Sequence, residues 1–277
     1  MPKVPYIIVF DIDRAIVGRV KYIVAEKQIN RNIIDLNQDT LKEHYKPDFV
    51  GDMKEGLLRP GFADFINFCK KKYKPCEFYV YTLSSYEWTY NGLVESIEKA
   101  AGIKFCKPYF NRENSLEYRG KSIMHVIDHV KQKYKINKNV NLNDKILFID
   151  DIENNTTTFK NRQIKCPKYN SIISRDVYKN LTDFYGEDLV KTLEIETLFN
   201  NYDIPYYSEK SNDIVYKDKK YYDVNVELFR RYDELYSEKF KDDNFFEILI
   251  NKLTDLSDKT IKNINAHLKK QEESSDK

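Results

Sequence analysis

The sequence has few cysteines, almost no net charge and no long apolar run, and each absence excludes a class of protein. Its four cysteines contain no CxxC pair, so we expect neither a disulfide framework nor a zinc site, and a reducing compartment fits best. The 46 basic and 44 acidic residues give a net charge of +2. This balance gives no bulk electrostatic reason to expect nucleic acid or a membrane as a partner.

The chain also shows no segment that would cross a membrane or act as a leader. No apolar run approaches the roughly 18 residues that a membrane span needs, and the first apolar run is too short for a signal peptide. We therefore expect an intracellular protein, cytoplasmic or nuclear. A hydrophobic content of 41%, with 22 tyrosines and 16 phenylalanines, is typical of a packed core. The length of 277 residues suits one sizeable domain with additional elements, or two small ones.

The apolar run Tyr6–Phe10 is followed by two aspartates, Asp11 and Asp13. Five consecutive apolar or aromatic residues predict a strand that is covered on both faces. In an open parallel sheet, ligands bind beyond the carboxyl ends of the strands. Residues two apart on a strand share a face. The pattern predicts a phosphoryl-transfer site with Asp11 as nucleophile, Asp13 as acid and base, and magnesium between substrate and protein.

The pattern after this strand is typical of alternating helices and strands. Strands are predicted at residues 76–81, 103–109, 145–149 and 163–166, and helices at 62–72, 86–101 and from 121 onward. The predicted strand at 76–81 ends at Thr82, and the predicted strand at 145–149 runs into Asp150 and Asp151. This alternation predicts a doubly wound α/β domain over residues 1–175, with an insertion at 18–58.

The periodicity changes after residue 175. Apolar residues recur at helical spacing around 228–236, 246–256 and 261–268. We therefore predict a helical C-terminal region over residues 176–270 and a disordered polar tail over 271–277.

The order of these polar residues resembles the haloacid dehalogenase (HAD) superfamily of phosphohydrolases. Asp11 and Asp13, then Thr82, then Lys121, then the pair Asp150–Asp151 match its four motifs in order. The segments RPG-x-x-x-F at 59–65 and YVYTLSSYEW at 79–88 look like those of the FCP/SCP-type carboxy-terminal-domain phosphatases. The resemblance covers residues 5–170. It implies a HAD-like doubly wound parallel sheet with helices on both faces, and hydrolysis of phosphoserine or phosphothreonine in proteins.

The chemistry of the aspartates follows from their residue type. A carboxylate can attack phosphorus to give an aspartyl-phosphate, which we assign to Asp11. Asp13 would protonate the leaving alkoxide and then take a proton from water. Magnesium prefers oxygen ligands and commonly takes one or two carboxylates; we assign Asp11 and Asp151 to it, and Asp150 either binds it or supports the site. The resemblance implies that the backbone carbonyl of Asp13 is a further ligand.

The remaining site residues would bind the phosphoryl group. Thr82 and backbone N–H groups near Leu83 would hold its oxygens at the start of the following helix. Lys121 would neutralise the charge shared by nucleophile and phosphate.

Arg14 and Ala15 depart from the first motif, in which the family usually has threonine or valine at the position of Ala15. Arg14 would either contact phosphate or pair with Asp13 and disable it. Two alternatives to a phosphoprotein phosphatase therefore remain. The first is a phosphatase of nucleotides or polynucleotide ends. The second is an inactive module that binds phosphoprotein or another protein partner through the C-terminal helices.

Overall fold

The computed structural model describes residues 4–18, 49–84, 92–115, 121–171, 205–208, 213–216 and 242–275. The chain forms two compact units. The first comprises residues 1–18, 58–170 and 242–277, and the second comprises 19–57 and 171–241. The predicted site residues all belong to the first unit.

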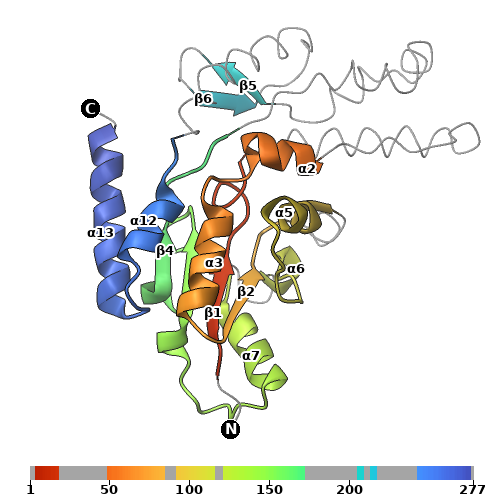
Figure 1. Ribbon diagram of the computed structural model, residues 1–277, viewed down its shortest axis with the longest axis vertical. Coiled ribbons are helices and arrows are strands. Elements are labelled where there is room, and N and C mark those ends of the chain that lie inside the picture. Colours follow the sequence, from red (N-terminus) through yellow and green to blue (C-terminus); the bar gives the residue numbers. More distant parts are fainter. Residues whose placement is uncertain are drawn as a thin grey trace, which may run out of the picture. The chain divides into compact units, whose positions relative to one another are not determined.

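A parallel sheet forms the centre of the first unit (Figure 1). Its strands are β1 (Tyr6–Phe10), β2 (Cys76–Val80), β3 (Ile146–Asp150) and β4 (Gln163–Lys165), in the order β2-β1-β3-β4. Each neighbouring pair is parallel, and Ile8 of β1 is in register with Phe78 on one side and Leu147 on the other. The central strand therefore ends at the same edge of the sheet as β3, as the sequence predicted.

Alternate residues of β1 face opposite layers of helices. Ile7 and Val9 belong to a buried cluster with α7 (Ile123–Lys133). Phe10 points the other way, and its ring lies 5.3 Å from that of Phe62 in α3 (Phe62–Lys72). Helices on both faces of a parallel sheet confirm the predicted α/β fold. Shorter elements complete this part: α5 (Val94–Ala101), α6 (Arg112–Ser115) and the 3₁₀ turns η4 (Asn143–Lys145) and η5 (Lys160–Arg162).

One predicted strand does not form. Residues 103–109 run beside β2, and the backbone N–H of Cys106 donates to the Phe78 carbonyl at 2.7 Å. Among the described residues, the only ladder pairing here is an isolated bridge between Tyr81 and Phe110. Pro108 has no N–H to donate, which explains why the pairing stays discontinuous.

The predicted C-terminal helices form, and they pack within the first unit, a point that the sequence left open. They are α12 (Phe245–Lys252) and α13 (Asp258–Ser275). The Phe246 ring lies 5.3 Å from both Phe62 and Phe65. A Cβ at Gly61 would lie 3.3 Å from that of Phe246, so glycine permits this close approach.

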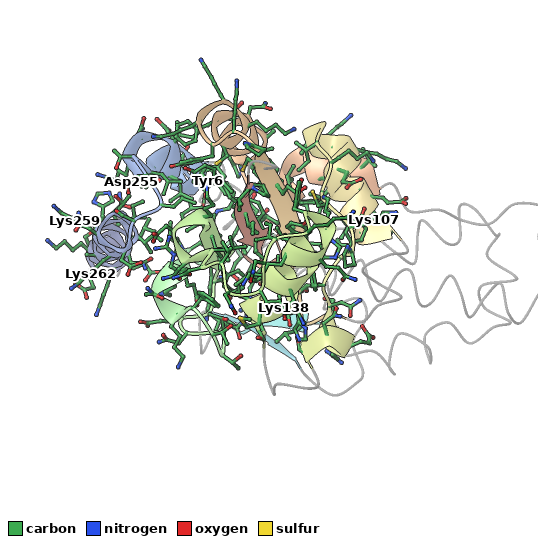
Figure 2. The ribbon with its side chains drawn as sticks, turned by 90° about the horizontal axis from the view of Figure 1, so that it is seen from below. Tyr6, Lys107, Lys138, Asp255, Lys259 and Lys262 are labelled. Atoms are coloured by element: carbon green, nitrogen blue, oxygen red, sulfur yellow. The ribbon has the colours of Figure 1, made fainter. Side chains whose placement is uncertain are left out.

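The last helix, α13, lies beside the edge strand β4. The Asn265 side chain accepts from the backbone N–H of Lys165 and donates to the carbonyl of Gln163, and so occupies the free edge of β4. Figure 2 shows Lys259 and Lys262 projecting from α13. The helix extends to Ser275, five residues into the stretch where the sequence predicted a disordered tail.

The second unit contains α2 (Phe49–Asp52), the π-helical turn η1 (Met53–Leu57) and an antiparallel hairpin. The hairpin strands are β5 (Pro205–Ser208) and β6 (Asp213–Tyr216). Most of the predicted insertion at 18–58, the helical pattern at 228–236 and the start of the predicted helix at 86–101 lie outside the described residues. No helix in the described part of the chain is long and apolar enough to cross a membrane.

Candidate active site

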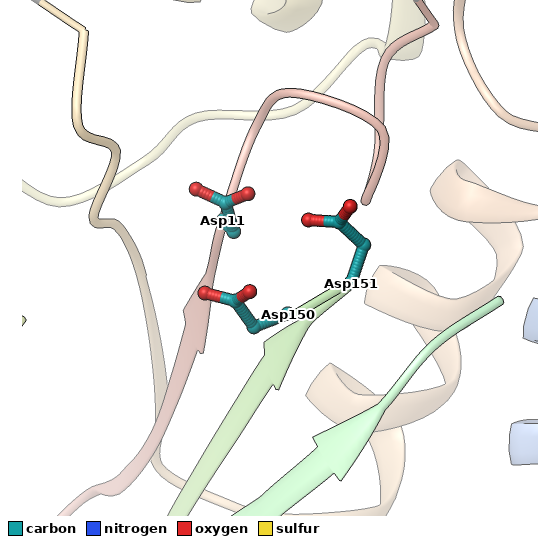
Figure 3. Close-up of side chains that lie close together, drawn as sticks. All are labelled: Asp11, Asp150 and Asp151. Atoms are coloured by element: carbon teal, nitrogen blue, oxygen red, sulfur yellow. The ribbon is translucent and has the colours of Figure 1, made fainter. Parts of the chain in front are cut away.

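Three carboxylates from two neighbouring strands meet at the carboxyl edge of the sheet (Figure 3). Asp11 follows the last residue of β1, Asp150 is the last residue of β3, and Asp151 comes directly after it. Each offers one carboxylate oxygen, and the three oxygens lie within 4.8 Å of one another. All three side chains are buried. The sequence predicted this convergence from the strand ends alone.

A tight turn over residues 12–17 follows Asp11 and places Asp13. The carbonyl of Ile12 accepts from the N–H groups of Ala15, Ile16 and Val17 at 3.0–3.3 Å, and Arg14 N–H donates to the Val17 carbonyl at 2.7 Å. Arg14 adopts a left-handed conformation with φ = 59°. The turn therefore forms with Arg14 and Ala15 at positions where the resemblance expects other residues.

Lys121 is the central cation of the site. Its side chain is 1% exposed, and its Nζ lies 2.5 Å from Asp11 Oδ1 and 2.7 Å from Asp150 Oδ2. Burial opposes the charge on this amine, but the two carboxylates outweigh it and raise the pKa of Lys121. The lysine therefore stays protonated and bridges the two strand ends.

Asp150 and Asp151 have different surroundings although they are adjacent. Asp150 accepts from Lys121, from the side-chain amide of Asn155 and from the backbone N–H of Ile152. Among the described residues, no hydrogen-bond donor reaches the buried Oδ2 of Asp151, which forms an ion pair with Arg14 Nε at 3.6 Å. Asp150 thus supports the lysine, whereas Asp151 lies beside the arginine of the turn.

The Asp13 carboxylate faces a different group of residues from the other three aspartates. Its Oδ2 accepts from the Ser84 hydroxyl at 3.0 Å and lies 3.4 Å from the Thr82 hydroxyl. Burial raises the pKa of Asp13, and the hydrogen bond from Ser84 partly offsets this effect. A carboxyl group with a raised pKa keeps its proton to a higher pH than an ordinary aspartate, as a general acid requires.

The cluster holds more negative than positive charge. Burial raises the pKa of Asp11 to about 8, and the neighbouring Asp150 and Asp13 carboxylates add to the effect of burial while Lys121 lowers it. Burial likewise raises the pKa of Asp151. If all four carboxylates were ionised, they would outnumber Lys121 and the partly exposed Arg14 by two negative charges. Either protons or a divalent cation must compensate for this excess.

The phosphate-binding residues expected from the sequence lie beside Asp13. Thr82 is fully buried, and its hydroxyl also accepts from the Ser84 N–H at 3.1 Å, while Leu83 is 38% exposed. Arg112 holds residues 82–84 in place. Its backbone N–H donates to the Ser84 carbonyl, and its side-chain Nε donates to the Leu83 carbonyl.

Two residues at the site were not predicted to take part. Ser84 orients Asp13, and Asn155 orients Asp150. A polar side chain at a strand end was the only sequence signal for either, and it does not distinguish these residues from an ordinary turn.

No family model matches the sequence, and no curated protein matches it. Among solved structures, the chain is similar to a variant of the RNA polymerase II CTD phosphatase Fcp1 from fission yeast, bound to beryllium fluoride. The match has 14% sequence identity and a TM-score of 0.34. It covers 86% of this chain and 65% of the phosphatase chain, so this chain spans slightly less than two thirds of that structure.

Proposed function

We propose that this chain is a magnesium-dependent phosphatase that hydrolyses phosphate monoesters through an aspartyl-phosphate on Asp11. One observation carries the proposal. Three buried carboxylates gather around one buried lysine at the carboxyl edge of the sheet, so that their ionised forms outnumber the lysine by two charges. Such a cluster costs stability unless a ligand compensates for it, so a structural role alone does not account for it.

The donor set fits a magnesium ion. Asp11 and Asp151 would hold it, and the buried Asp151 Oδ2, which accepts no hydrogen bond from the described residues, would be a ligand atom. Asp150 has its oxygens engaged by Lys121 and Asn155 and would support these ligands. When bound, the ion would supply positive charge next to the transferring phosphoryl group.

The chain's own residues would carry out the two chemical steps. An oxygen of Asp11 attacks phosphorus while the bond to the leaving alkoxide breaks, and the Asp13 carboxyl gives that alkoxide its proton. Water then attacks the phosphorus of the aspartyl-phosphate and gives a proton to Asp13, which releases phosphate and restores Asp11. Ser84 and Thr82 hold the Asp13 carboxylate during both steps.

Lys121 would keep Asp11 in place. It would also balance the negative charge that shifts between the Asp11 carboxylate and the phosphoryl group during the reaction. Its contacts of 2.5 Å to Asp11 and 2.7 Å to Asp150 leave the other Asp11 oxygen available for attack. The lysine is fully buried, so this charge acts with little screening by solvent.

The substrate class we propose is phosphoserine or phosphothreonine in a protein. The support for it is the resemblance of residues 59–65 and 79–88 to the FCP/SCP-type phosphatases. The C-terminal helices α12 and α13 pack against the sheet domain, and we propose their outer surface for any protein partner.

Hydrolysis of an aryl phosphate, measured with and without magnesium, tests the reaction. We expect turnover that requires the ion and that disappears in Asp11→Asn, with unchanged circular dichroism as the control for folding. Comparison of phosphopeptides with nucleotides and 3′- or 5′-phosphorylated oligonucleotides then tests the substrate class. The absence of magnesium-dependent turnover with every ester would contradict the proposal and favour the inactive binding module.

A further inference from the structure

The turn over residues 12–17 is tied to the C-terminal segment by a buried arginine, Arg59. Its Nη1 donates to the Ala15 carbonyl at 3.0 Å, and its Nε and Nη2 donate to the two carboxylate oxygens of Asp243 at 2.8 Å each. Arg59 is 1% exposed. A bidentate pair with a carboxylate fixes the plane of the guanidinium group, so Nη1 has a defined direction toward the turn.

Aromatic rings and backbone bonds restrict Arg59 further. Its guanidinium carbon lies 4.4 Å from the centre of the Phe245 ring and 5.5 Å from that of Tyr169. Its own N–H donates to the Ile16 carbonyl at 2.9 Å. Arg59 thus contacts the turn through both its backbone and its side chain.

The chain leaves and re-enters this unit at four places, and each lies at the same turn. The first excursion starts after Gly18 and ends at Leu58, and Leu58 forms a bridge with Val17. The second starts after Asn170 and ends at residue 242. Next to its start, the N–H of Tyr169 donates to the Arg14 carbonyl at 2.8 Å, and next to its end Asp243 pairs with Arg59.

We propose that Arg59 and Asp243 are positioning residues for the reaction, an inference that rests on the proposed function. They hold the turn so that Asp13 meets Ser84 and Arg14 meets Asp151. Neither residue contacts the carboxylate cluster, so each acts through the turn. The pair also makes the geometry of Asp13 depend on the segments at the ends of the two excursions.

A second buried arginine provides a matched control. Arg162 is fully buried, donates to the carbonyls of Ile146 and Leu256, and pairs with Asp258 at the start of α13. It therefore also fixes the C-terminal segment to the sheet domain. Its contacts reach the start of β3, at the opposite end of the strand from Asp150.

The experiment compares Arg59→Lys with Arg162→Lys in the full chain. Lysine keeps the charge but cannot bind Asp243 with two parallel hydrogen bonds and still reach Ala15. We expect Arg59→Lys to lower kcat for an aryl phosphate by about 10- to 100-fold with KM changed less than about threefold. We expect Arg162→Lys to lower the midpoint of urea unfolding without lowering kcat. Asp243→Asn, which keeps the side-chain shape, should reproduce the effect of Arg59→Lys in weaker form.

Amide hydrogen exchange gives a readout that does not depend on turnover. We expect the N–H groups of residues 14–17, which are bonded within the turn, to exchange faster in Arg59→Lys and at the wild-type rate in Arg162→Lys. Equal losses of kcat in both variants, or unchanged exchange at 14–17 in Arg59→Lys, would overturn the inference.

The two proposals fail in different ways. If the wild type hydrolyses no ester but Arg59→Lys still accelerates exchange at residues 14–17, the phosphatase proposal is wrong, and the support of the turn by Arg59 stands as structure. If the wild type is active and Arg59→Lys keeps both kcat and exchange, the positioning role is wrong and the phosphatase proposal stands.

Discussion

Two clusters of buried charge lie at opposite ends of the same sheet, and they are satisfied to very different extents. At the amino end, the Glu77 carboxylate accepts from Lys133 Nζ at 2.5 Å, from the Tyr134 hydroxyl at 2.5 Å and from the Tyr79 hydroxyl at 2.7 Å. At the carboxyl end, Lys121 is shared by two carboxylates.

The direction of the pKa shifts follows this difference. Burial works against the charge of Glu77, but its three donors outweigh burial and lower its pKa. Asp11 is more deeply buried and has one strong donor, and its pKa is raised to about 8. A cluster that satisfies its own charge is accounted for by stability alone. A cluster with uncompensated charge is a candidate for ligand binding, and this contrast is why we propose the carboxyl end of the sheet as the functional end.

The largest effect that we expect comes from removing the nucleophile. Asp11→Asn should reduce turnover of an aryl phosphate by about 1,000-fold or more, because an amide oxygen does not form the aspartyl-phosphate. The matched control is Glu77→Gln, the same change of a buried carboxylate to an amide at the other end of the sheet. Turnover in Asp11→Asn comparable to that in Glu77→Gln would mean that Asp11 is not the nucleophile.

The second largest effect that we expect is on the affinity for a divalent cation. Asp151→Asn should weaken binding of Mg²⁺ or Mn²⁺ at least about 10-fold, because it removes a charged ligand whose oxygen has no hydrogen-bond donor. Isothermal titration calorimetry with the cation alone measures this directly. Unchanged affinity in Asp151→Asn would show that the cation binds elsewhere.

Glu77→Gln should change stability and leave the reaction intact. We expect a loss of about 1–3 kcal/mol in the free energy of unfolding at pH 7, because the carboxylate accepts three hydrogen bonds, one from a charged donor. Urea denaturation measures the loss, and a kcat near the wild-type value would confirm that this cluster is structural.

The difference in unfolding free energy between wild type and Glu77→Gln should depend on pH in a defined direction. The pKa of Glu77 is lower in the folded chain than the ordinary value of 4.5. The stabilisation is therefore fully present above about pH 4.5 and is lost as the pH falls through the folded-state pKa. The difference in unfolding free energy between wild type and Glu77→Gln should shrink on acidification. A difference that grew toward low pH would contradict the assignment.

Arg14→Ala should have the smallest effect. The Arg14 side chain is 35% exposed and lies 3.6 Å from Asp151, so its removal should tighten binding of the divalent cation by about two- to fivefold. Calorimetric titration measures the change, with Arg14→Lys as the variant that keeps the charge. A raised KM for the ester with unchanged affinity for the cation would instead support a phosphate contact by Arg14.

The sequence predicted the strands and the polar residues at their ends better than the contacts between residues that are far apart in the chain. The strands at β1, β2, β3 and β4 and the polar residues at their ends were visible because buried parallel strands are short apolar runs. The unequal roles of Asp150 and Asp151 were not visible, since they depend on which side chain meets Lys121. The pairing of Arg59 with Asp243 joins residues 184 positions apart, and no periodic pattern encodes such a contact.

Two features of the fold could not be predicted, each for its own reason. The interrupted pairing at 103–109 results from a proline within an apolar run that otherwise has strand character. The C-terminal helices were predicted from their own periodicity, but that periodicity does not say what covers their apolar faces. Here Phe246 packs against Phe62 and Phe65, so that the helices complete the core of the sheet domain.

The arrangement of the four chain junctions at one turn has a consequence for how such a protein can change. Each excursion begins and ends beside residues 12–17, so its two ends are already close together when the domain folds. The entropy of closing a loop grows only with the logarithm of its length. Polypeptide can therefore be added, removed or exchanged between Gly18 and Leu58, or between Asn170 and Asp242, at little thermodynamic penalty and without altering the register of the parallel strands that carry Asp11 and Asp150.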